Sequence, residues 1–82
     1  MKDNEKRLKQ VMMDVLDISY EAINEDTSVD TVDEWDSVKH LNLVLAIEAE
    51  FDITFTEEQT VEILSYPLIK IVLEEHGIRF DI

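Results

Sequence analysis

The chain has no cysteine, one glycine and one proline among its 82 residues. Without cysteine there can be no disulfide, no thiolate zinc site and no cysteine nucleophile. Few residues interrupt helices, and 45% of the chain is hydrophobic. This composition predicts a folded, mostly helical chain and argues against disorder.

Basic residues are also scarce, because 7 Lys and Arg stand against 20 Asp and Glu, for a formal net charge of −13. Such a surface repels nucleic acid and anionic membranes and attracts proteins with basic patches, although solubility alone is a sufficient reason for it. No apolar stretch is long enough to span a bilayer, and the charged residues 1–7 do not resemble a signal peptide. We expect a cytoplasmic monomer that binds no nucleic acid.

A chain of this length forms one domain with one small core, because it hides only about 60–65% of its unfolded surface. We expect the domain to span residues 1–82, with loose termini at residues 1–2 and 79–82. A first helix is predicted over about residues 3–17, capped by Asp3 or Asn4. Its apolar residues recur at helical spacing, at Leu8, Val11, Met12, Val15 and Leu16.

A second helix is predicted over about residues 37–51, with Asp36 as its N-cap. Its predicted buried arc excludes Leu43 and contains Val38, Leu41, Val44, Leu45, Ile47 and Phe51. Before this helix, residues 19–36 form a long connection whose polar side chains are expected to bond to nearby backbone. A short helical turn around residues 20–23 is possible there.

Two shorter patterns complete the chain. Thr56 and Gln59 form a capping box, which opens a short helix that ends near Leu64 and turns Val61 and Leu64 inward. Ser65 can cap the last helix, with Pro67 in its first turn and Gly77 as a left-handed residue after its end. The predicted core face of that helix contains Leu68, Ile69, Ile71, Val72 and Leu73. The fold class is therefore an all-α antiparallel bundle of three principal helices, one short helix and a long loop between helices one and two.

No metal site is expected. A calcium-binding loop starting at Asp26 fails, because it needs a glycine near Thr31 and a bidentate glutamate at Ser37. His40 and His76 do not have the spacing of metal ligands, and we expect His40 to be a surface residue.

Ser37 is the most informative residue, because it lies at the start of the strongly apolar second helix, directly after an acidic loop. A serine after an aspartate at a helix start is usually part of a cap. The sequence argues against a hydrolase that uses Ser37, because it offers neither a base with an orienting acid nor an oxyanion hole. A first-turn side chain points outward, so Ser37 is well placed to carry a bulky covalent group.

The chain resembles the acyl carrier proteins over essentially its whole length. Asp36-Ser37-Val38 is similar to the family's Asp-Ser-Leu motif with one conservative change, and residues 43–53 are close to the family's second helix and its exit. The resemblance implies an acyl-carrier-type antiparallel four-helix bundle that is not itself an enzyme. It further implies that Ser37 carries a 4′-phosphopantetheine arm, added from coenzyme A by a phosphopantetheinyl transferase with a divalent metal.

The same resemblance implies that the arm carries acyl or aminoacyl groups as thioesters, loaded by a ligase and used by downstream synthase or transferase enzymes. Partner or transferase recognition is assigned to Asp36, Val38, Lys39, Asn42, Leu45, Glu48 and Ala49. The resemblance places Val38 and Leu45 at an exposed edge, where they touch partner enzymes or the arm, whereas we expect Leu41 in the core. Lys39, Asn42 and Ala49 stand where fatty-acid-synthesis members usually have acids, while Glu48 and Glu50 remain acidic. These differences suggest a specialised pathway, such as polyketide, aminoacyl or cell-surface-glycan modification. The alternative is an unmodified acidic helical protein-interaction module.

Overall fold

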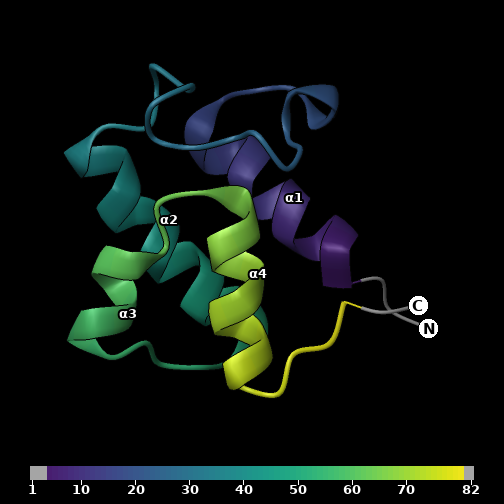
Figure 1. Cartoon of the computed structure of the whole chain (residues 1–82), viewed down its shortest axis with the longest axis vertical. Coiled ribbons are helices and arrows are strands. Elements are labelled where there is room, and N and C mark those ends of the chain that lie inside the picture. The colour runs from purple at the N-terminus through teal and green to yellow at the C-terminus, as the bar shows by residue number, and fades with distance from the viewer. Residues whose placement is uncertain (1–3, 81–82) are drawn as a thin grey trace.

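The computed structural model describes residues 4–80, and within that range the elements of regular secondary structure are helices joined by loops. Four α-helices and one 3₁₀-helix follow one another as α1 (Asn4–Leu16), η1 (Tyr20–Ala22), α2 (Ser37–Phe51), α3 (Glu57–Glu62) and α4 (Tyr66–Glu75). Figure 1 shows α1 and α2 behind α4, with α3 at one side and the long loop running across the top. The predicted all-α bundle with a long first loop is confirmed.

The predicted starts of α2, α3 and α4 are confirmed by hydrogen bonds from backbone to side chain. The Lys39 N–H donates to Asp36 Oδ1 over 2.9 Å at the start of α2. At α3, Thr56 and Gln59 each accept a bond from the other's backbone N–H, which completes the capping box. Ser65 caps α4 in the same way, and Pro67 lies in its first turn. These caps depend on residues three apart in the sequence, so local pattern is enough to predict them.

The helix ends use left-handed residues. Gly77 has a φ of 89°, and the Ile78 N–H donates to the Leu73 carbonyl over 3.0 Å, as predicted for the end of α4. Two aspartates adopt the same backbone region after α1 and α2, Asp17 with φ 57° and Asp52 with φ 56°. Aspartate tolerates this region better than most side chains, which lets a chain with one glycine still end three helices sharply.

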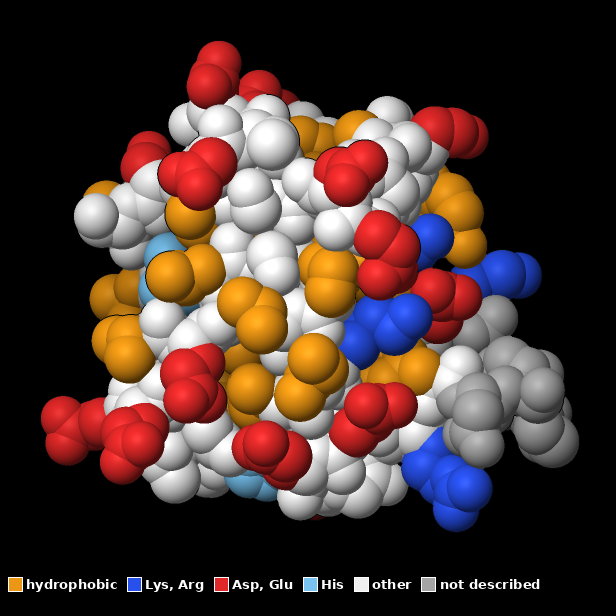
Figure 2. Space-filling model, viewed as in Figure 1, with side chains coloured by type: hydrophobic (Ala, Val, Ile, Leu, Met, Phe, Trp, Pro, Cys, Tyr) orange, Lys and Arg blue, Asp and Glu red, His pale blue; other side chains and the backbone are white. Residues whose placement is uncertain are grey.

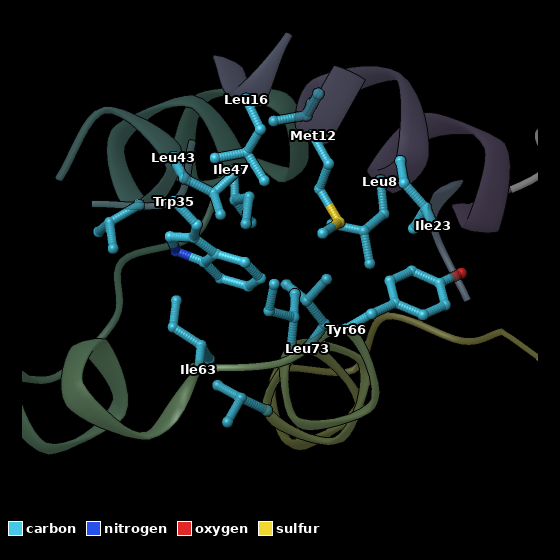
Figure 3. Close-up of a cluster of buried hydrophobic side chains, with 14 of the residues drawn as sticks. Leu8, Met12, Leu16, Ile23, Trp35, Leu43, Ile47, Ile63, Tyr66 and Leu73 are labelled. Atoms are coloured by element: carbon cyan, nitrogen blue, oxygen red, sulfur yellow. The ribbon is translucent and has the colours of Figure 1, made fainter. Parts of the chain in front are cut away.

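One apolar core lies between the helices and is drawn in Figure 3. Leu8, Met12 and Leu16 of α1 face Leu43 and Ile47 of α2 in that view, and Trp35 projects from the loop toward the same centre. The remaining fully or nearly buried apolar side chains are Val11, Ile23, Val32, Val44, Phe51, Phe55, Ile63, Tyr66, Ile69, Val72 and Leu73.

The predicted buried arc of α2 is wrong in part. Leu43 is fully buried, whereas Val38, Leu41 and Leu45 are 68, 60 and 56% exposed. The reason is that α2 is apolar around most of its circumference, and its orientation is set by packing against α1, which the sequence pattern does not reveal. Burial therefore falls on the face of Leu43 and Ile47, one step around the helix from the predicted arc.

The inward orientation predicted for several residues of α3 and α4 is also wrong. The side chains concerned are exposed by 41 to 67%, and they are Val61, Leu64, Leu68 and Ile71. Ile63, Ile69, Val72 and Leu73 close the core in their place. A domain this small has room for only part of the apolar side chains that its helices offer.

The two ends of the described chain meet. The Asn4 amide donates to the Arg79 carbonyl over 2.9 Å, and Phe80 packs against the core, although the sequence predicts a loose tail there. Asp3 and the terminal residues 1–2, 81 and 82, for which the sequence also makes predictions, lie outside the described residues.

A buried tyrosine joins α1 to α4. The Tyr66 hydroxyl donates to Glu5 Oε2 over 2.9 Å, and Lys70 Nζ lies 3.5 Å from the same oxygen. This hydrogen bond, aided by Lys70 and Lys9 and opposed by partial burial, holds the pKa of Glu5 below its ordinary value of 4.5. Burial, reinforced by Glu5, raises the pKa of Tyr66, so the hydroxyl keeps the proton that it donates.

Glu5→Gln should lower the free energy of unfolding at pH 7 by about 0.5–1 kcal/mol, because Glu5 is partly exposed and its ion pair is screened. The pKa of Glu5 is lower in the folded state, so its contribution is complete above the unfolded value and lost as the pH falls through the folded one. The difference from wild type in urea unfolding should therefore shrink as the pH falls below the ordinary glutamate pKa of 4.5. Glu21→Gln, with the same change in net charge, is the control, and an equal pH dependence in both variants would contradict this assignment.

Candidate functional site

Ser37 is the first residue of α2 and its side chain is exposed. The residue before it, Asp36, is the N-cap, so the cap does not require the Ser37 hydroxyl. Four residues on, the His40 N–H donates to the Asp36 carbonyl over 2.8 Å and begins the regular helix. This arrangement presents the serine oxygen to solvent at the positive end of a 15-residue helix.

The loop before Ser37 is held by its own polar side chains, as predicted. The buried Thr27 accepts from the Asn24 N–H over 2.8 Å and donates to the Ala22 carbonyl over 2.7 Å. Thr31 makes similar bonds, accepting from the Ser28 N–H and donating to the Asp26 carbonyl. The loop therefore has a defined shape even though most of it lacks regular secondary structure.

Backbone bonds also tie this loop to the connection between α3 and α4. The Val29 N–H donates to the Leu64 carbonyl over 3.0 Å, and the Tyr66 N–H donates to the Thr27 carbonyl over 2.8 Å. These bonds flank a single antiparallel bridge between Ser28 and Ser65. Residues more than 30 positions apart in the sequence are thus joined beside the entrance to α2.

Trp35, His40 and Thr60 form a hydrogen-bonded chain next to Ser37. The indole Nε1–H of Trp35 donates to His40 Nδ1 over 3.0 Å, and His40 Nε2 lies 2.7 Å from the Thr60 carbonyl oxygen. Since the indole can only donate, Nδ1 must accept, and the proton on Nε2 is then donated to Thr60. The two rings also stack, with centroids 6.2 Å apart and planes at 24°.

The expectation that His40 is a plain surface residue is therefore wrong. Its ring is half-buried and links the loop, α2 and α3. Trp35 is buried, and a buried indole N–H needs an acceptor, which His40 supplies from the first turn of the next helix. Because both ring nitrogens are engaged, His40 is not placed to take a proton from Ser37.

A shallow pocket opens beside the serine. Its lining combines apolar and polar side chains from the loop, the first turn of α2 and the end of α3: Val29, Trp35, Asp36, Ser37, His40 and Leu64. The pocket gives room for an extended group that starts at the Ser37 oxygen, with apolar walls on one side.

Several residues predicted to recognise partners share one exposed face of α2. Val38, Asn42, Leu45 and Ala49 follow one another at spacings of three or four, and all are exposed. Leu41, predicted to be in the core, lies on this exposed side instead and is 60% exposed. The exposed edge expected for Val38 and Leu45 is confirmed, while their contact with partners stays a prediction.

Two other predicted recognition residues bond within the chain. Lys39 Nζ donates to the Val15 carbonyl over 3.2 Å near the end of α1. Glu48 Oε2 accepts from the Phe55 N–H over 2.7 Å. Glu50 likewise pairs with Arg7 over 2.8 Å. These side chains therefore link separate parts of the bundle.

Within residues 4–80, no three His, Asp or Glu side chains come close enough to hold a metal ion. In the same range, no helix is both long and apolar enough to cross a membrane.

Comparison with known proteins gives one consistent result. The chain is 38% identical over 64 residues to proteins named acyl carrier protein from Buchnera aphidicola subsp. Acyrthosiphon pisum, strains Tuc7, 5A and APS. The match covers 77% of this chain and 79% of each of those proteins. No family model matches the chain.

His40→Ala should lower the free energy of unfolding by about 1–3 kcal/mol, because the Trp35 N–H loses its acceptor and the Thr60 carbonyl loses its donor. Hydrogen exchange of the Trp35 indole N–H, followed by NMR, should become faster. His40→Gln keeps a group that can accept and donate. It should restore a large part of the stability and of the protection of the indole N–H. Asn42→Ala on the same helix is the control, with an effect within about 0.5 kcal/mol. Unchanged indole protection in His40→Ala would refute the hydrogen-bonded chain.

Proposed function

Because the chain belongs to the acyl carrier protein family and so has a carrier role, we propose that Ser37 is the attachment point of a 4′-phosphopantetheine arm. The proposal rests on the different roles of Asp36 and Ser37 at the start of α2. Asp36 caps the helix with its own side chain, which leaves the exposed Ser37 hydroxyl available for modification. The alternative role of Ser37 as a plain cap is thereby disfavoured.

The surroundings of Ser37 fit a phosphodiester. The first N–H groups of an α-helix have no partner within the helix, and together with the helix dipole they favour an anion near the N-terminus. This offsets part of the repulsion that a further negative charge meets on a chain of charge −13. The apolar wall of the neighbouring pocket, Val29 and Leu64, suits the aliphatic part of the arm.

The arm, when bound, supplies a thiol on which acyl or aminoacyl groups are carried as thioesters, and this chain has no thiol of its own. The chain's own residues position and present the attachment site. Trp35 and His40, which stand before and after Ser37 in the sequence, are joined by a hydrogen bond that fixes the backbone on either side of the serine. Asp36 fixes the first turn of α2 and offers an exposed carboxylate to the enzyme that modifies the serine.

The partners in this proposal are a phosphopantetheinyl transferase, a loading ligase and downstream synthase or transferase enzymes, met by a monomeric, cytoplasmic carrier. The exposed face of Val38, Asn42, Leu45 and Ala49 carries no charge, and Lys39 and Glu48 are bonded internally. A largely neutral face selects partners by shape and apolar contact rather than by charge alone. This supports a dedicated carrier in a specialised pathway over a housekeeping one.

Incubation with coenzyme A, Mg²⁺ and a broad-specificity phosphopantetheinyl transferase should add the mass of one phosphopantetheine, measured on the intact protein. Ser37→Ala should show no gain, whereas Ser19→Ala, which removes another exposed serine hydroxyl, should be modified like wild type. A folded wild-type protein that gains no mass with several transferases would favour the unmodified acidic interaction module instead.

Asp36→Asn distinguishes the role of Asp36 as N-cap from its role in transferase recognition. An asparagine side chain can still accept a hydrogen bond from the Lys39 N–H, but it carries no charge. We expect an unchanged melting temperature and a fall of about tenfold in kcat/KM for the transferase reaction. Asp36→Ala should in addition lose about 1 kcal/mol of stability. Transfer at the wild-type rate by the asparagine variant would show that the carboxylate does not contact the transferase.

A further inference from the structure

A second apolar surface lies on α3 and α4, apart from the exposed face of α2. It consists of four side chains that we call the α3–α4 stripe, with exposed fractions of 67, 41, 42 and 51% for Val61, Leu64, Leu68 and Ile71. Neighbouring residues such as Ile63 and Ile69 already fill the core. The stripe is therefore apolar surface that the fold does not use.

The stripe reaches the serine pocket at Leu64, which lies in the connection between α3 and α4. Leu68 and Ile71 are three residues apart and share one face of α4, and Val61 lies in the last turn of α3. Leu64, within the stripe, also lines the pocket beside Ser37. Figure 2 shows hydrophobic side chains gathered in the middle of the face that α3 and α4 present, with acidic side chains spread around them.

The charges around the stripe are mainly negative. Glu57, Glu58 and Glu62 of α3 and Glu74 and Glu75 of α4 are all exposed. The one basic residue of α4, Lys70, is directed toward Glu5 and lies 5.2 Å from the centre of the Tyr66 ring. A partner must therefore combine an apolar centre with basic residues at its edge.

We propose that the α3–α4 stripe is a docking surface for a partner protein that presents an apolar helix face flanked by Lys or Arg. A second copy of this chain would bring the same ring of glutamates against itself, and an anionic membrane would meet a chain of charge −13. Docking at this stripe does not require a modified Ser37. It leaves the exposed face of α2 free and shares Leu64 with the pocket beside Ser37.

The test uses a synthetic amphipathic peptide of about 18 residues, with leucines along one helix face and lysines elsewhere, titrated into the full ¹⁵N-labelled chain carrying Ser37→Ala. The largest chemical-shift changes should fall on residues 61–71. The double variant Leu68→Ser, Ile71→Ser should weaken the Kd by about tenfold or more. The matched variant Val38→Ser, Leu45→Ser removes two apolar side chains of α2 that are more exposed than Leu68 and Ile71, and it should leave the Kd within about twofold.

Several results would overturn the proposal. Shift changes centred on α2, or equal losses in the two double variants, would assign the peptide to another surface. Equal binding of a peptide with serines in place of its leucines would show attraction by charge alone. Concentration-dependent dimers in sedimentation that Leu68→Ser, Ile71→Ser abolishes would make the occupant a second copy, and binding to vesicles of anionic lipid would make it a membrane. Because Ser37 is absent from the tested protein, each of these results is independent of whether Ser37 carries an arm.

Discussion

The hydrogen-bonded chain of Trp35, His40 and Thr60 is the constraint on which the presentation of Ser37 depends. Burial of Trp35 stabilises the core, but it also requires an acceptor for the indole N–H. His40, in the first turn of α2, supplies this acceptor. Its other ring nitrogen bonds to the Thr60 carbonyl of α3. Ser37 thus lies between Trp35 and His40, which are both held by hydrogen bonds. These bonds give the end of the long loop a defined conformation.

Features that depend on neighbours in the sequence could be predicted, and features set by packing could not. Asp36, Thr56 and Ser65 act as caps through residues three positions away, and Gly77 ends its helix through local backbone geometry. Leu41 and Leu43 exchanged their predicted environments because α1 decides which side of α2 is covered. The role of His40 could have been predicted only by asking which residue accepts the Trp35 indole N–H, and the sequence does not identify that residue.

The distribution of charge also differs from what composition suggests. Lys39 and Glu48 are predicted from the sequence to recognise partners, yet each bonds to another part of the chain, and Glu50 pairs with Arg7. The acids that remain exposed lie largely on the loop and around α3 and α4. The molecule therefore offers a nearly neutral face along α2 beside an apolar stripe with acidic borders, and these two surfaces suit partners of different chemistry.

The bridge between Ser28 and Ser65 has a consequence for the order in which the protein folds. The loop gains its backbone partners only when Leu64 and Tyr66 are in place, and these residues come late in the chain. Closing so long a segment has an entropic cost that must be met before the bonds form. The contact between α1 and α2 does not require these later residues. On a chain emerging from the ribosome, the loop before Ser37 therefore cannot complete its backbone bonds until Tyr66 has been made.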